Sequence, residues 1–451
     1  MVKHLAHMRG ITPWVTGIRY AASHVLSLSA VLLFAVGFMI LAPLSAGAGE
    51  FTTGGEVFAG LRVYPDDAVF GNRAEWDLGG RVDLMWRQGR TWAVKASPRI
   101  LWDPADPGRW QWIPFELWGE GRAGAWRLRA GRQIFSWGVA DAFNPSDILP
   151  TRDLGENFRD ADKLGDWAVT LVRAGDAWGL EAVVIPWVEG AQFPSARSPW
   201  SLDAAASRLD VPATVTLDDT PYLPDDAREL SFAGRLRGSF GDTDLYLVGH
   251  TGTARAPVLT FPTVGFFSAQ ARATYLPLHL LGLEGQTALG DWVFKGSWMW
   301  RDQATTDSLI NEQIFGPQGI DPQASQGVVG AEYLWFEVLG GLGDLSTSLE
   351  YLWDTGARES NLATYRPFES NLALGVRYQF NDTAGSWVEA SWLESLKRPE
   401  RFAAIRGSRR LWRNLRAEVF AEFLRGPDGP PSLFYFFEPN DRVGILTRYA
   451  F

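Results

Sequence analysis

The feature that most constrains this chain is an alternation of apolar and polar residues with a period of two, repeated in many segments of about ten or more residues. From Ala74 to Trp86, one face carries Trp76, Leu78 and Val82, while the other face is mostly charged. The same alternation recurs in three later segments: 292–301, 345–353 and 372–380. Because successive side chains of a strand point to opposite faces, we predict β-strands that are apolar on one side.

The length and the ends of these segments distinguish two kinds of sheet. A soluble β-sandwich shows the same alternation, but its strands are usually about five or six residues long. The segments here are longer, and their apolar faces begin or end in Trp, Tyr or Phe, as strands do at a membrane interface. The chain has 22 Trp and 27 Phe, and its mean hydropathy of -0.09 excludes a bundle of transmembrane helices.

Short and long connectors alternate along the whole chain. The short ones are 88–89, 122–124, 175–176, 241–242, 290–291, 341–344, 381–385 and 409–414. The long polar ones are 64–73, 103–112, 138–165, 188–228, 255–265, 302–325, 355–368, 397–400 and 425–441. We therefore predict an all-β fold, a transmembrane antiparallel up-and-down β-barrel of about 18 strands with both termini on the periplasmic side. A count of about 16 is also acceptable, because a strand near 266–288 contains Pro277 and connector 397–400 is short.

The first 48 residues have the three parts of a signal peptide. Lys3, Arg9 and Arg19 precede an apolar run over 25–41, and Ala-Gly-Ala at 46–48 follows as a processing site. A transmembrane anchor is the alternative, but the run of about 17 residues is shorter than the roughly 20 that a span needs. We predict a signal peptide at 1–48 and a barrel at 49–451 with long outer loops at 138–165, 188–228 and 302–325.

The predicted mature chain is acidic and lacks cysteine. Of the 42 Lys and Arg and the 52 Asp and Glu, the leader contains three basic residues and no acid, which leaves a net charge of -13. This charge argues against nucleic acid as a partner. The absence of cysteine fits a protein that crosses an oxidising periplasm. We place the protein in the cell outer membrane, with lipid as the partner of its apolar face.

The last residues alternate in the same way. Val443, Ile445, Tyr449 and the terminal Phe451 share one face. This ending resembles the C-terminal assembly signal of outer-membrane barrels, which implies recognition by the barrel-assembly machinery.

Residues that would support catalysis or metal binding are sparse. Only His250 and His279 lie outside the predicted leader, and an interface or loop role is the simpler interpretation of both. There is no cluster of Cys and His for a metal and no phosphate-binding glycine loop. We expect no cofactor, no metal and no enzymatic activity.

One segment differs from the rest of the chain. Residues 131–150 begin as a strand with Gly-Arg-Gln and continue into a loop rich in Gly, Asn, Pro and Asp. This string resembles bacterial outer-membrane β-barrel families of the porin type, namely domain-of-unknown-function barrels and, more distantly, alginate-export-like channels. The resemblance covers about 25 residues and implies transport without naming a cargo. The pore candidates are Arg132, Trp137, Asp141, Asn144, Pro145 and Asp147, extended by Arg152 and Asp153.

The same segment permits two physical interpretations. It could fold inward and narrow the lumen, with Asp147 or Asp141 paired to Arg132 or Arg152. It could instead be a turn with an Asx cap at Asn144 that only stabilises the loop.

The polar faces of the strands are predicted to line the lumen. The candidate lumen charges are Asp77, Arg81, Asp83, Arg127, Arg129, Arg235, Arg237, Glu350, Arg377 and Glu418. Four of these arginines could form a basic stripe, or they could pair with acids of the loops. The sign of any selectivity therefore stays open.

The expected function is transport. We predict a porin-like channel or an export conduit for small solutes or a secreted product. Export would add a periplasmic adaptor or an inner-membrane exporter as a partner. The alternatives are a structural or adhesive barrel with a filled lumen, and a barrel hydrolase that uses His250 or His279.

Overall fold

The computed structural model describes ten ranges of the chain: 49–65, 74–103, 111–155, 161–208, 214–225, 227–265, 268–303, 323–356, 369–428 and 432–451. The predicted signal peptide at 1–48 lies outside the described residues. So do most of the predicted outer loop at 302–325 and parts of the loops at 138–165 and 188–228.

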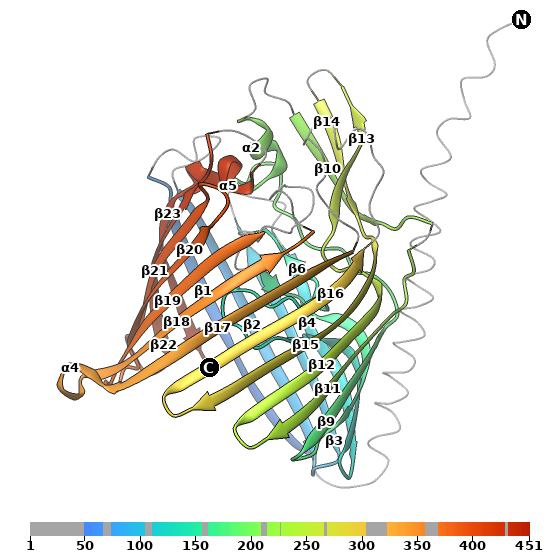
Figure 1. Cartoon of the computed structure of the whole chain (residues 1–451), viewed down its shortest axis with the longest axis vertical. Helices are drawn as coiled ribbons and strands as arrows, with labels where there is room; N and C mark the ends of the chain where they lie inside the picture. Colours follow the sequence, from blue (N-terminus) through green and yellow to red (C-terminus); the bar gives the residue numbers. More distant parts are fainter. Residues whose placement is uncertain are drawn as a thin grey trace, which may run out of the picture.

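Eighteen strands form one closed antiparallel sheet (Figure 1). Each strand of this sheet pairs with the next one along the chain, and the last, β23, pairs with β1 from Glu56 opposite Ala450 to Val63 opposite Val443. The predicted up-and-down barrel of 18 strands is therefore confirmed. Its strands are β1 (Glu50–Val63), β2 (Ala74–Gln88), β3 (Trp92–Trp102), β4 (Gln111–Ala123), β5 (Trp126–Gln133), β8 (Asp166–Arg173), β9 (Trp178–Ile185), β11 (Ser231–Phe240), β12 (Thr243–Thr253), β15 (Pro277–Leu289), β16 (Trp292–Gln303), β17 (Gln323–Glu337), β18 (Gly343–Asp354), β19 (Ser370–Phe380), β20 (Trp387–Ser395), β21 (Arg401–Arg410), β22 (Leu415–Arg425) and β23 (Arg442–Ala450).

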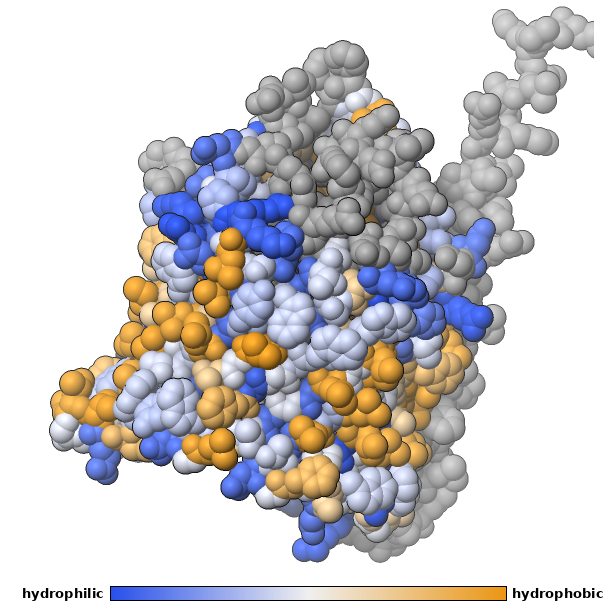
Figure 2. Space-filling view, viewed as in Figure 1, coloured by the Kyte–Doolittle hydropathy of each residue, from blue (hydrophilic) through white to orange (hydrophobic). Residues whose placement is uncertain are grey.

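The outer face of the barrel is apolar and the inner face is polar. In β2, Trp76 and Leu78 are each 46% exposed, whereas Asp77 between them is 1% exposed. Figure 2 shows apolar side chains gathered over the middle of the strands, with hydrophilic side chains toward the ends. A ring without edges satisfies its backbone hydrogen bonds in hydrocarbon, and lipid solvates the apolar band. The protein is thus a transmembrane barrel of the outer-membrane type.

Exposed aromatic side chains mark both borders of the band. Near the short turns they include Trp126, Trp178, Phe240 and Trp292, and near the opposite end Trp76, Trp102, Trp112 and Trp300. Trp76 and Trp102 meet edge to face, with ring centroids 5.1 Å apart. Aromatic rings at these heights match the two interfaces of a bilayer.

All eight predicted short connectors join neighbouring strands at one end of the barrel. Gly241 and Gly290 occupy two of these turns with φ of 61° and 62°, a conformation that favours glycine in tight hairpins. The backbone of Phe451 bonds with that of Gly55 near the start of β1, so both described ends lie on this side, as predicted. Helix α4 (Val338–Gly341) is at the same end (Figure 1).

The opposite end carries the long connectors and additional structure. These elements are β6 (Arg152–Asp153), β7 (Asp162–Lys163), α2 (Leu202–Ala206), β10 (Thr214–Tyr222), β13 (Val258–Val264), β14 (Ser268–Thr274), α5 (Leu433–Phe437) and the 3-10 helix η2 (Glu438–Asn440). β14 pairs with β13 and, in parallel, with β10, so two separate connectors share one small sheet above the barrel (Figure 1).

One predicted boundary is wrong. The membrane strand expected near 266–288 begins only at Pro277, and 268–274 form β14 of the outer sheet. Proline lacks the N–H that a strand interior needs, so it is placed at the start of β15. The outer connector is therefore longer than the predicted 255–265. The connector at 397–400 is a short outer turn between β20 and β21.

Among the described residues, no helix is long and apolar enough to cross a membrane.

Candidate functional site

The loop after β5 enters the barrel. Phe135 and Trp137 are buried in a cluster with Val183, Val248 and Met299, which project from the inner faces of β9, β12 and β16. Farther along, Ala140 and Phe143 pack against a second cluster on the inner faces of β17, β18 and β19. Residues 134–150, the inserted segment from here on, therefore lie along the inner wall across much of the barrel.

Local sequence specifies the bend of the inserted segment. Gly138 has φ of 117°, and a side chain there would overlap the carboxamide of Asn144. That carboxamide accepts a hydrogen bond from the N–H of Ala140 and donates one to its carbonyl, both at 2.8 Å. The segment therefore folds inward, and 144–147 form a turn in which the N–H of Asp147 donates to the carbonyl of Asn144 at 3.0 Å, while the Asn144 side chain bonds back to Ala140.

The tip of the inserted segment is tied to the opposite wall. The carboxylate of Glu350 on β18 accepts the N–H groups of Asp141 and Ala142, each at 2.8 Å. Lys295 on β16 donates to the Asp141 carboxylate at 2.8 Å and to Glu332 on β17 at 2.9 Å. Charge-assisted bonds to two strands, β16 and β18, therefore fix the tip, and Glu332 holds Lys295 in place.

The base of the inserted segment is closed by a buried carboxylate. Asp147 pairs with Arg152 and, at 2.8 Å, with Lys163. The same carboxylate accepts the N–H of Trp137 at 3.3 Å, and the indole N–H of Trp137 donates to Glu181 on β9 at 3.2 Å. Asp147 and Arg152 are one of the pairs that the sequence suggested.

Two of the pore candidates lie outside this arrangement. Arg132 pairs with Glu189 of the β9 to β11 connector at 2.7 Å, and not with Asp141 or Asp147. Asp153 belongs to the small strand β6, where its carboxylate accepts the N–H of Gly155. The structure thus brings together Trp137, Asp141, Asn144, Asp147 and Arg152, with Pro145 in the same turn.

Arg132 and Glu189 belong to a buried charged cluster at the outer end of the wall. Asp166 on β8 accepts hydrogen bonds from the backbone N–H and hydroxyl of Thr151 and lies 4.0 Å from Arg255. The Arg255 guanidinium is buried and has no hydrogen-bond partner among the described residues. Burial raises the pKa of Glu189 to about 7, against the lowering effect of Arg132.

The predicted lumen charges lie on the inner face, opposite the exposed apolar residues. Most of them are paired with a residue of the same or a neighbouring strand. The pairs are Asp77 with Arg62 at 3.0 Å, Arg81 with Asp83 at 3.2 Å, Arg127 and Arg129 with Glu120 at 3.7 and 2.6 Å, Arg235 with Glu181 at 3.3 Å, and Arg377 with Glu389 at 3.6 Å. Arg237 donates to the carbonyl of Gly175, and Glu418 also faces inward on β22. Among the described residues, Arg127, Arg129 and Arg235 therefore pair with acids of strands, whereas Arg237 bonds to a backbone carbonyl of a short turn.

Open space remains on both sides of the inserted segment. A cavity of about 540 Å³ lies beside its tip, along the inner faces of β18 to β20, with Asp141, Glu350 and Arg377 in its lining. A smaller space of about 90 Å³ lies beside Trp137 and is lined by Arg129 and Arg235. Charged groups in such spaces need water to solvate them.

The two histidines lie on opposite faces of the sheet. His250 is inward, and its Nδ1 lies 3.2 Å from the carbonyl of Leu278. His279 alternates outward on β15, where its Nδ1 lies 2.9 Å from the hydroxyl of Thr251. Within the described ranges, no group of three His, Cys, Asp or Glu side chains could hold a metal ion.

Four wall residues that hold the inserted segment are not among the residues predicted from the sequence. Val248, Met299, Val328 and Leu352 are apolar but sit on the otherwise polar face of their strands. All four are fully buried. An apolar residue out of phase in several successive strands was the available signal that something covers the inner wall.

No family model and no curated protein matches the chain. Among solved structures, OmpT of Vibrio cholerae in its trimer form is 12% identical, with a TM-score of 0.46 over 90% of this chain and 100% of that one. OccK5 of Pseudomonas aeruginosa is 10% identical, with a TM-score of 0.47 over 89% of this chain and 97% of that one. A mutant of the Rh. blastica porin is 9% identical, with a TM-score of 0.40 over 89% and 100%. At this level of likeness the barrel assignment rests on the strand pairing described above.

Proposed function

We propose that the protein is a porin-like channel through which small hydrophilic solutes cross the outer membrane, and that the inserted segment sets the width of the path. One observation carries this proposal: a segment is fixed against the inner wall of a closed barrel and leaves charged cavities beside it. A wide barrel with charged inner residues holds water between them. The cross-strand ion pairs reduce the net field in the lumen and keep these side chains in place.

Planar-bilayer recording of the purified protein tests the proposal. We expect stepwise currents that neutral polymers reduce only below a size limit, because the remaining space beside the inserted segment is narrow. No current at any voltage would contradict the channel and favour the structural or adhesive barrel. Replacement of His250 and His279 by Gln is expected to leave the currents intact, since neither histidine lines the two cavities beside the segment.

The partners follow from the same proposal. Lipid covers the apolar band, and the barrel-assembly machinery recognises β23, which turns Val443, Ile445 and Tyr449 outward and is followed by Phe451. Phe451→Ala keeps the backbone pairing with Gly55, so we expect less folded barrel in the membrane but unchanged currents from each inserted molecule. A periplasmic adaptor or inner-membrane exporter follows only if the barrel exports a product, and co-purification after crosslinking tests for it.

A further inference from the structure

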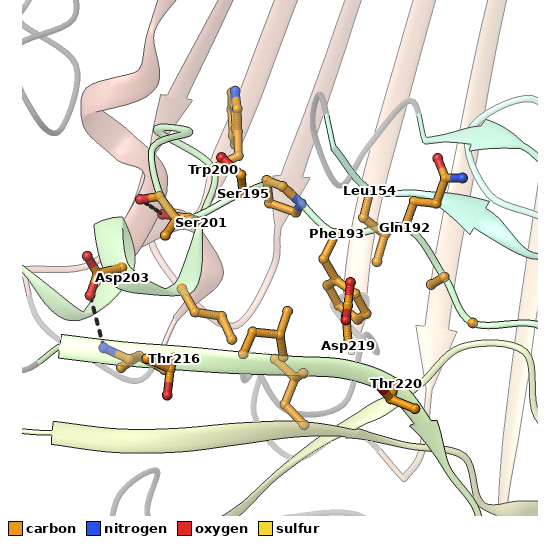
Figure 3. Close-up of a pocket in the computed structure, with 18 of the residues that line it drawn as sticks. Leu154, Gln192, Phe193, Ser195, Trp200, Ser201, Asp203, Thr216, Asp219 and Thr220 are labelled. Atoms are coloured by element: carbon orange, nitrogen blue, oxygen red, sulfur yellow. Dashed lines mark hydrogen bonds between the residues drawn. The ribbon is translucent and has the colours of Figure 1, made fainter. Parts of the chain in front are cut away.

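A cavity of about 790 Å³ lies at the outer end of the barrel, and none of its lining residues belongs to the inserted segment. Residues 190–203 of the β9 to β11 connector form one side, and β10 forms the other (Figure 3). Leu259 of β13 and Phe437 of α5 also line it. The volume falls in the range of about 300 to 1,000 Å³ that is typical of small-molecule sites.

Most polar groups of this cavity are uncharged. They include the amides of Gln111 and Gln192 and the hydroxyls of Ser195, Ser201, Thr216 and Thr220. Two carboxylates, Asp203 and Asp219, are the charged groups, and no Lys or Arg occurs among the described residues of the lining. An anionic solute would meet no opposite charge at this place.

The polar groups of the cavity differ in whether they have hydrogen-bond partners within the protein. Asp203 accepts the N–H of Val215 at 2.9 Å, so it joins α2 to β10 (Figure 3). The side-chain oxygens of Gln111 and Gln192 are buried and have no donor among the described residues. Buried acceptors without a donor are a cost that a bound hydroxyl group would remove.

Apolar side chains lie beside these acceptors. Phe193 lies near Asp219 in the middle of the view, and Leu154 lies next to Phe193 (Figure 3). Leu217 of β10 and Leu259 of β13 belong to the same apolar cluster as Phe193. The cavity therefore offers an apolar surface surrounded by hydrogen-bond acceptors and hydroxyls.

We propose that this cavity binds an uncharged, polyhydroxylated solute of the size of a short oligosaccharide, at the mouth of the channel. Such a solute has an apolar C–H face for Phe193 and hydroxyl donors for Gln111, Gln192 and Asp219. The cavity indicates which class of solute the proposed channel would carry. The role of the cavity in transport therefore rests on the proposed channel function. A cationic amine would use Asp219 but leave the many uncharged groups without a partner.

Titration calorimetry of the purified protein tests the proposal with three probes: maltotetraose as the neutral solute, tetragalacturonate as the anionic one and spermidine as the cationic one. We expect maltotetraose to bind and the two charged probes to bind at least about tenfold more weakly. We expect Asp219→Asn and Phe193→Leu each to weaken maltotetraose binding by roughly threefold, the effect of one lost contact.

Asp218→Asn is the matched control. Asp218 is the neighbouring residue of β10, but it lies 4.0 Å from Arg272 and does not line the cavity. We expect maltotetraose binding within about twofold of the unchanged protein. Gel mobility of the folded barrel checks each variant.

Three outcomes would overturn the proposal: no binding of maltotetraose, tighter binding of either charged probe, or equal effects of Asp218→Asn and Asp219→Asn. Bilayer currents from the same preparation separate the two proposals. Currents without maltotetraose binding overturn the site alone, whereas binding without currents contradicts the channel and leaves the site intact.

Discussion

Two regions of the inner wall differ in what they carry and in what covers them. On β12, β16, β17 and β18 the wall carries Val248, Met299, Val328 and Leu352, and the inserted segment buries this region. On β2 to β5 the wall carries charged residues that pair with one another, such as Arg81 with Asp83, which are both partly exposed, and Arg129 with the buried Glu120. The comparison teaches that a fully buried apolar residue on the inner face marks a place where chain lies on the wall, whereas a partly exposed charged residue marks a place where water reaches the wall.

The largest expected effect comes from a charge placed under the inserted segment. Met299→Asp buries an unpaired carboxylate, so we expect a loss of about 3 kcal/mol or more in the free energy of unfolding. Met85→Asp is the matched control, because Met85 also faces inward but is partly exposed and lies opposite Lys95 on β3. Urea unfolding followed by gel mobility measures both. Equal losses would show that the two regions do not differ.

The bend of the inserted segment gives the second comparison. Gly138→Ala combines a positive φ with an overlap at Asn144, so we expect a cost of about 2 to 3 kcal/mol, seen in the urea midpoint and in wider currents. Gly124→Ala also has a positive φ, of 60°, which alanine adopts at a smaller cost, and it has open space around it. Its cost is expected to be about 1 kcal/mol. If Gly138→Ala left the urea midpoint and the currents unchanged, Asn144 would not define the turn.

The charged cluster of Arg132, Asp166, Glu189 and Arg255 predicts a dependence on pH. The folded protein holds the proton of Glu189 up to a pKa of about 7, above the usual value of 4.5. Stability from this carboxyl is therefore highest at low pH and falls as the pH rises from about 4.5 to about 7. We expect a change of about 1 to 2 kcal/mol, since part of the side chain reaches solvent. Glu189→Gln should flatten the urea midpoint between pH 5 and 7, and an unchanged slope would contradict the assignment.

The smallest expected effect concerns the tip of the inserted segment. Glu350→Ala removes the acceptor of two N–H groups, but water in the cavity can replace it, so we expect a stability loss of about 1 kcal/mol. Noisier currents should accompany it, because Lys295 alone then holds the tip. Glu418→Ala, an inward carboxylate away from the inserted segment, is the control. If the current noise of Glu350→Ala were as low as that of Glu418→Ala, Glu350 would not hold the tip.

Much of the wall could be predicted because its signal is local. Alternation in each strand reports which side faces lipid, and the glycine and aspartate turns report where each hairpin ends. The strand at Pro277 was misplaced because 268–274 also alternate, and only their pairing with β10 and β13 assigns them to the outer sheet. Partners of Arg132 could not be predicted, since Glu189 is far along the chain and lies in a connector with no repeating pattern.

By itself, the sequence determined the barrel, the number of its strands, the end that carries the short turns and the side chains that face lipid. These depend on residues next to or opposite one another in consecutive strands, where backbone geometry leaves few choices. Only the tertiary structure decided that residues 134–150 lie on the inner wall, that Glu350 binds their tip, and that two connectors build one outer sheet with a cavity. The contacts of the inserted segment join strands far apart in the chain, which the closed ring places around one lumen, and the outer sheet joins two connectors that have no repeating pattern.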